Sequence, residues 1–136
     1  MKKSIFKSIL VVLLFTLTAC NLSTTKLQIA VKAANVECPI DAGNGAIVTE
    51  IYTEDNNVVY KTSVDENELV SVADFDNEIV ISLMKAAMIE SIQNQNSKEE
   101  KEFIELIKGA NYNLVFRYIG NSSNYQVDIV ISPDEI

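Results

Sequence analysis

The sequence predicts an α+β fold, a four-stranded antiparallel sheet with helices packed on one face, in the order α-β-β-α-α-β-β. Two pairs of segments rich in Val, Ile, Thr and Tyr alternate in polarity and predict hairpins within residues 46–64 and 112–131. Between these hairpins, residues 76–93 and 97–109 carry apolar side chains at helical spacing. Another helical pattern precedes the first hairpin.

The first predicted helix covers residues 26–34, where the apolar positions share one face. Pro39 limits it, because the residue before a proline is disfavoured in the α region, and residues 41–45 then predict a turn or loop. The first hairpin pairs residues 46–53 with 58–64, and the asparagines between them tolerate the backbone of a tight turn.

Acidic residues at the start of the 76–93 helix complement its dipole. Ser97-Lys98-Glu99-Glu100 matches a capping box that opens the next helix, and Gly109 is suited to close it. The last hairpin turns at residues 120–124, and its strict alternation predicts one buried face that the two preceding helices cover.

The N-terminus has the pattern of a secretory signal. Three lysines precede an apolar run from Ile9 to Leu17, which is shorter than the roughly 20 residues that a transmembrane helix needs. The run ends in Leu17-Thr18-Ala19-Cys20.

These four residues resemble the lipobox of bacterial lipoproteins. The resemblance implies cleavage between Ala19 and Cys20, and attachment of diacylglycerol and fatty acids such as palmitate to Cys20. The predicted organisation is a signal peptide at 1–19, a lipidated tether at 20–25 and a single α+β domain at 26–136. An ordinary signal with a chance cysteine and an uncleaved anchor helix remain alternatives. Asn21 after the cysteine favours an outer membrane of the cell envelope, and the lack of an acidic run after Cys20 favours its periplasmic face.

Charge and composition exclude several function classes. Signal cleavage removes three of the 11 basic side chains and none of the 19 acidic ones, which leaves a net charge of −11. Such a charge repels nucleic acid and anionic headgroups, so we expect no nucleic-acid partner and membrane contact through the lipid on Cys20. The sequence has no histidine, so it has neither a Ser-His-Asp nor a Cys-His site.

Three groups of residues are candidates for chemistry. Asp74 to Glu78 places oxygen ligands at alternate positions, as a calcium loop does, but Ile79 and Lys85 replace the glycine and glutamate that an EF-hand requires. We therefore expect a solvated helix start and no metal. Cys38 is either a reactive thiol or a small core residue, and neighbouring Glu37 favours the core.

The third group is Glu50 with Asp128, which could serve as general acid and base or could lie on the wet face of the sheet. All five tyrosines fall within or beside the predicted strands. They suit either an exposed binding surface or buried rings with their hydroxyls at the rim, and we expect the latter. These residues are Tyr52, Tyr60, Tyr112, Tyr118 and Tyr125.

Residues 34–39, with the glycines at 43 and 45, resemble small lipoproteins of unknown function from gut bacteria, and so do residues 116–120 and 131–135. The resemblance implies no known activity, and it places Cys38-Pro39 in the framework of the domain. We therefore expect a non-enzymatic binding or interaction module without a catalytic residue, metal or cofactor. Its partners would be the membrane, through the lipid, and an unknown protein or small-molecule ligand. The alternative is a small enzyme that uses carboxylates or Cys38.

Overall fold

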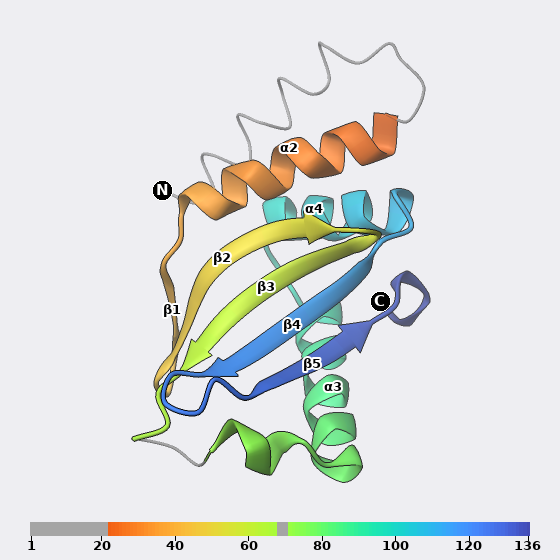
Figure 1. Ribbon diagram of the computed structural model, residues 1–136. Coiled ribbons are helices and arrows are strands. Elements are labelled where there is room, and N and C mark those ends of the chain that lie inside the picture. The colour runs from red at the N-terminus through yellow and green to blue at the C-terminus, as the bar shows by residue number, and fades with distance from the viewer. Residues whose placement is uncertain (1–21, 68–70) are drawn as a thin grey trace.

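The computed structural model describes residues 22–67 and 71–136 (Figure 1). Ala19 and Cys20, the predicted cleavage and lipidation residues, lie outside the described residues. The described elements are α2 (Leu22–Val36), β1 (Ile40–Gly43), β2 (Ala46–Glu54), β3 (Asn57–Val64), the 3-10 helix η1 (Val72–Phe75), α3 (Glu78–Gln93), α4 (Lys98–Gly109), β4 (Asn113–Gly120), β5 (Gln126–Ile131) and the 3-10 helix η2 (Pro133–Glu135).

The sheet has five strands in the order β1-β2-β3-β4-β5, and the β3–β4 pair at its centre is parallel. The prediction of four antiparallel strands therefore misses one strand and the parallel direction of the β3–β4 pair. Each predicted hairpin is antiparallel as expected, β2 with β3 and β4 with β5. The connection from Val64 to Asn113 carries both predicted helices, and such a crossover returns the chain beside β3 in the same direction.

The additional strand, β1, lies where the sequence analysis predicts a loop. Ile40 pairs with Val48 and Asp41 with Ile47, so β1 and β2 form a third hairpin. Its turn has positive φ at Gly43, Asn44 and Gly45. Asn-Gly is a strong signal for a tight hairpin turn, and that signal is present in the sequence at residues 44–45.

The helices begin and end with local caps. The Asn77 side chain accepts hydrogen bonds from the first backbone N–H groups of α3, and Ser97 caps α4 as predicted. Gly109 is the last residue of α4, but Asn111, with φ of 58°, makes the left-handed turn after it. The first helix, α2, begins at Leu22, so residues 22–25 of the predicted tether are helical.

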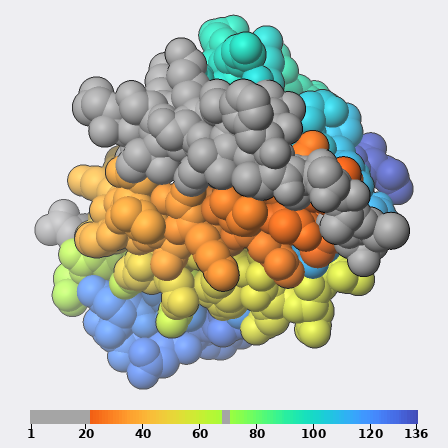
Figure 2. All heavy atoms as spheres, turned by 90° about the horizontal axis from the view of Figure 1, so that it is seen from above, coloured from red at the N-terminus to blue at the C-terminus, as the bar shows by residue number. Residues whose placement is uncertain are grey.

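The main core lies between α2, α4 and one face of the sheet, with β2 directly beside α2 (Figures 1 and 2). Leu27 of α2, Ile107 of α4 and Ile131 of β5 are fully buried in it. A smaller cluster of Val64, Val72 and Val127 joins η1 to the far end of the sheet. The helices thus cover one face, as predicted.

The helix predicted at residues 76–93, α3, packs mainly against β5. None of its residues is fully buried, and the side chains of Ile79 and Leu83 are 71% and 67% exposed. Within residues 22–67 and 71–136, no helix is both long and apolar enough to cross a membrane.

Candidate functional site

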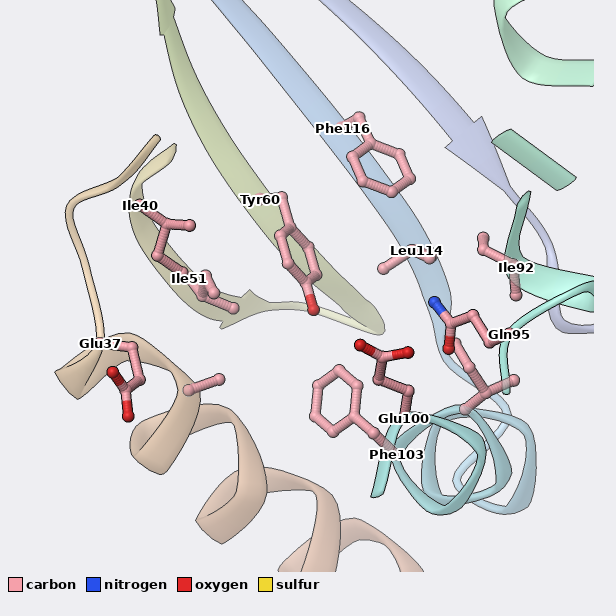
Figure 3. Close-up of a pocket in the computed structure, with 12 residues that line it drawn as sticks. Glu37, Ile40, Ile51, Tyr60, Ile92, Gln95, Glu100, Phe103, Leu114 and Phe116 are labelled. Atoms are coloured by element: carbon pink, nitrogen blue, oxygen red, sulfur yellow. The ribbon is translucent and has the colours of Figure 1, made fainter. Parts of the chain in front are cut away.

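An apolar cleft lies between the sheet, the end of α2 and the start of α4 (Figure 3). Its volume is about 260 Å³. Seven helices and strands and the loops after α2 and α3 contribute its described lining, mostly with branched and aromatic side chains. The lining residues are Ala34, Glu37, Ile40, Ile51, Tyr60, Ile92, Gln95, Glu100, Phe103, Ile104, Leu114 and Phe116.

A contact between two aromatic rings and one hydrogen bond at the edge of the cleft hold its walls together. The Tyr60 and Phe116 rings, on the neighbouring strands β3 and β4, lie 5.4 Å apart between centroids at an interplanar angle of 34°. The Asn35 Oδ1 atom accepts a hydrogen bond from the backbone N–H of Ile51 over 2.9 Å. This bond fixes the end of α2 to β2, so the wall between them is preorganised.

Four polar side chains interrupt the apolar lining, Glu37, Tyr60, Gln95 and Glu100. Tyr60, Gln95 and Glu100 direct their polar ends into the space between the sheet and α4 (Figure 3). The Oε1 atoms of Glu37 and Gln95 are buried and have no hydrogen-bond partner among the described residues. The cleft thus combines apolar walls with unsatisfied acceptors.

Burial raises the pKa of the Tyr60 hydroxyl, and the nearby Cys38 and Glu100 raise this pKa further. Both effects disfavour a negative charge on the phenol oxygen. Tyr60 is therefore a neutral phenol at physiological pH, and it can donate or accept a hydrogen bond in the cleft.

Cys38 is half-buried beside the main core and lies close enough to Tyr60 to influence its pKa. Its position follows from the end of α2, where the backbone N–H of Cys38 donates to the Asn35 carbonyl oxygen, and from Pro39, which follows through a cis peptide bond. The expectation that Cys38 belongs to the framework of the domain agrees with this packing.

Glu50 and Asp128 lie on the opposite face of the sheet, away from the cleft. They belong to one cross-strand row in which Lys61 and Arg117 stand between them. Arg117 binds Asp128 with two hydrogen bonds of 3.0 Å and also donates to the Tyr52 hydroxyl over 2.9 Å. The structure does not bring Glu50 and Asp128 together as an acid and a base, and both lie on the wetter face.

The acidic segment before α3 has structural roles. Asn77 caps the helix, and Asp76 accepts a hydrogen bond from the Tyr125 hydroxyl over 2.5 Å. Over the described parts of the chain, no group of three His, Cys, Asp or Glu side chains is placed to hold a metal ion.

The five tyrosines differ in burial and in the face of the sheet on which they lie. Tyr112 is buried, Tyr118 joins the smaller core cluster, and Tyr52, with Arg117, covers the outer face of the sheet. Tyr125 is 41% exposed. The expectation of buried rings is therefore correct for only part of the set, and Tyr60 is the tyrosine that lines the cleft.

Sequence reasoning missed the cleft. Gln95 falls between the two predicted helices and Glu100 within the predicted capping box, whereas the Glu100 carboxylate points into the cleft (Figure 3). One signal was available, because Tyr60 falls on the same predicted strand face as buried Val58 and Val64. The sequence predicts that the 97–109 helix covers the sheet, but it has no signal that directs Glu100 towards Tyr60.

Two comparisons with known proteins gave no match, neither to a family model nor to a curated protein. Solved structures share the fold. A Pseudomonas aeruginosa protein inferred to be secreted aligns with a TM-score of 0.60 at 10% identity, over 83% of this chain and 91% of its own. EpsS, a pilotin from the Vibrio vulnificus type 2 secretion system, aligns with a TM-score of 0.55 at 8% identity, over 83% and 90%. At these identities the likeness shows the fold only.

Proposed function

We propose that this chain is a lipid-anchored, non-enzymatic interaction module of the bacterial cell envelope, and that its cleft holds an apolar segment of a protein partner. The cleft carries this proposal. A preformed apolar cavity with a few polar groups is the usual form of a binding site. An engineered apolar cavity of about 150 Å³ holds benzene, so a cleft of about 260 Å³ accommodates a leucine or phenylalanine side chain.

The shared fold supports a partner of protein nature, because one protein with this fold is a pilotin of a secretion system. The lipobox-like sequence ending at Cys20 supports the anchor, and the other protein with this fold is inferred to be secreted. The periplasmic face of an outer membrane remains the favoured location, because Asn21 follows Cys20 and no acidic run comes after it. Mass spectrometry of the protein from its own cells tests the anchor, because an unmodified Cys20 would exclude it.

A non-enzymatic role is supported by the chemistry of the cleft. Its polar groups are two carboxylates, one amide and a phenol that stays protonated. The phenol cannot act as a base at neutral pH, and the wetter-face carboxylates Glu50 and Asp128 are remote from the cleft.

A pair of matched variants tests the cleft. Ile40 and Ile47 lie on opposite faces of the β1–β2 hairpin, since Ile40 packs against the core at the cleft and Ile47 is 43% exposed. Ile40→Trp fills the cleft, whereas Ile47→Trp adds the same indole to the other face. Thermal melts would establish that both variants fold.

The lipoprotein is purified from its own membranes after chemical cross-linking, with a tag at the C-terminus. We expect one partner to cross-link to the wild type and to Ile47→Trp, and to decrease about tenfold with Ile40→Trp, which corresponds to about 1.4 kcal/mol. Undiminished cross-linking of Ile40→Trp would exclude the cleft as the binding site.

A further inference from the structure

The described lining of the cleft offers negative charge and hydrogen-bond acceptors. Glu37 at the end of α2 and Glu100 at the start of α4 both line it, and none of the described lining residues is a lysine or arginine. None of the ion pairs among the described residues involves either carboxylate. The Glu100 charge, which points into the cleft in Figure 3, is therefore available to a ligand.

Two acceptor atoms in this lining are buried and unsatisfied, the Oε1 atoms of Glu37 and Gln95. A buried acceptor without a donor costs free energy, and buried polar groups in folded proteins are nearly always paired. A ligand that brings N–H donors into the cleft would remove this cost, whereas a purely apolar ligand would not.

The surroundings of the Tyr60 hydroxyl also indicate a negative potential in this part of the cleft. Burial is the largest cause of its raised pKa, and the negative charge of Glu100, which is present at neutral pH, adds to it. A site that disfavours a phenolate by charge favours a cation by the same interaction. Figure 3 shows the Glu100 carboxylate and the Gln95 amide on the side of the cleft that Tyr60 faces.

From this arrangement we propose that the partner segment carries a basic side chain flanked by apolar groups. This inference rests on the proposed function and specifies the chemistry of the partner. The ammonium or guanidinium group lies between Glu100 and Gln95, where it donates to both. Its methylene stem and the neighbouring apolar side chains contact the wall formed by Ile40, Phe103 and Phe116. Long basic side chains combine an apolar stem with a charged end, which matches the composition of the cleft.

A simple pair of probes separates the cation from the apolar stem. The n-hexylammonium ion and 1-hexanol have the same chain length and differ in charge, and n-hexylammonium resembles an extended lysine side chain. The protein is the mature chain, residues 20–136, with Cys20→Ser so that no lipid competes for the probes. NMR titration follows the backbone amide signals of the cleft residues Tyr60 and Phe116.

We expect both probes to shift the cleft signals, with n-hexylammonium binding about five- to tenfold more tightly at low salt. Glu100→Gln should reduce this preference to within about twofold, because it removes the charge and keeps the shape. Glu105→Gln is the matched control, since Glu105 lies on the exposed side of the same helix and pairs with Lys108. The Glu105→Gln variant should keep the preference for n-hexylammonium over 1-hexanol. Raising the salt to about 0.5 M should also weaken the ammonium selectively.

The outcomes separate the two proposals. Equal affinity for n-hexylammonium and 1-hexanol in the wild type would overturn the basic side chain and leave the apolar cleft in place. A preference that survives Glu100→Gln would overturn the assigned contact. If neither probe shifts the signals of Tyr60 and Phe116, the cleft does not bind apolar groups, and the proposed function itself fails.

Discussion

The Glu66 carboxylate occupies the space that a side chain at position 120 would need, so Gly120 at the end of β4 is matched to Glu66. Glu66 accepts hydrogen bonds from the backbone N–H groups of Val72, Ser122 and Ser123, and from the hydroxyls of Ser71 and Ser123. One carboxylate thus joins the loop after β3, the start of η1 and the β4–β5 turn. These bonds serve the fold, at the end of the sheet far from the cleft.

The pH dependence of stability is the first consequence of this arrangement. Backbone hydrogen bonds, from Val72 above all and then from Ser123, lower the pKa of Glu66 from 4.5 to about 2. Because the folded pKa is lower than the unfolded one, the carboxylate stabilises the fold above about pH 4.5, and this contribution is lost as the pH falls towards 2. We expect the difference in free energy of unfolding between wild type and Glu66→Gln to shrink over that range.

Urea denaturation at a series of pH values between 7 and 2 measures this difference. Glu105→Gln provides the control, because Glu105 is exposed and its side chain is 4.0 Å from Lys108 in a marginal ion pair. The difference in free energy of unfolding between Glu105→Gln and the wild type should stay nearly constant over this pH range. A Glu66→Gln difference that is independent of pH would mean that Glu66 does not hold these bonds in solution.

Gly120→Ala tests the close approach directly. The added Cβ would collide with the end of the Glu66 side chain, which five hydrogen bonds hold in place. We expect a loss of about 1–3 kcal/mol in the free energy of unfolding, as for other overpacked sites. Gly109→Ala is the matched control, since its Cβ would meet Ser23 Oγ at an ordinary 3.6 Å and alanine is the better helix former.

A double-mutant cycle identifies the cause. In a Glu66→Ala background the collision is absent, so Gly120→Ala should cost less there than in the wild type. Equal costs in both backgrounds would place the effect of Gly120→Ala in the backbone instead of in the contact with Glu66.

The outer face of the sheet gives a third prediction. Arg117 is only 17% exposed in its side chain, and its strongest contact is the two-pronged pair with Asp128. Its hydrogen bonds to Asp128 raise the pKa of the guanidinium above its ordinary value. Asp128→Asn should lower the free energy of unfolding by about 1–2 kcal/mol, because two-pronged charge-assisted pairs are stronger than single bonds.

Glu54→Gln is the comparison for Asp128→Asn. Glu54 makes one bond of 3.3 Å to Arg117 and its side chain is 48% exposed, so its loss should cost less than about 0.5 kcal/mol. Urea denaturation midpoints measure both. If the two variants lose the same stability, the two-pronged geometry contributes nothing beyond a surface ion pair.

The local structure of this chain was largely predictable from sequence, because it depends on neighbouring residues. Alternation identified β2 to β5, and Ser97 identified the start of α4. The Asn44-Gly45 turn is equally local, but residues 41–45 also have the composition of a loop, and the loop prediction misses β1.

The parallel pairing of β3 with β4 was not predictable in the same way. It joins Val58 to Leu114 and Tyr60 to Phe116, which are 56 positions apart in the sequence, and no local pattern specifies such a register. The cleft depends on the same long-range packing. Glu100 has the sequence position of a capping residue, and only the placement of α4 against the sheet directs its carboxylate towards Tyr60.

The reactivity of Cys38 distinguishes the binding module from the alternative of a thiol enzyme. Cys38 is half-buried and packs beside the core. Burial in apolar surroundings disfavours the reactive thiolate. In the mature chain with Cys20→Ser, Cys38 is the single thiol, so one labelling rate reports on it alone.

We expect neutral iodoacetamide to label the native protein at least about tenfold more slowly than the urea-unfolded protein at the same pH, as for a thiol that must be exposed before it reacts. Mass spectrometry at timed intervals measures both rates. Native labelling as fast as unfolded labelling, or faster, would favour a reactive thiol at the cleft and the enzymatic alternative.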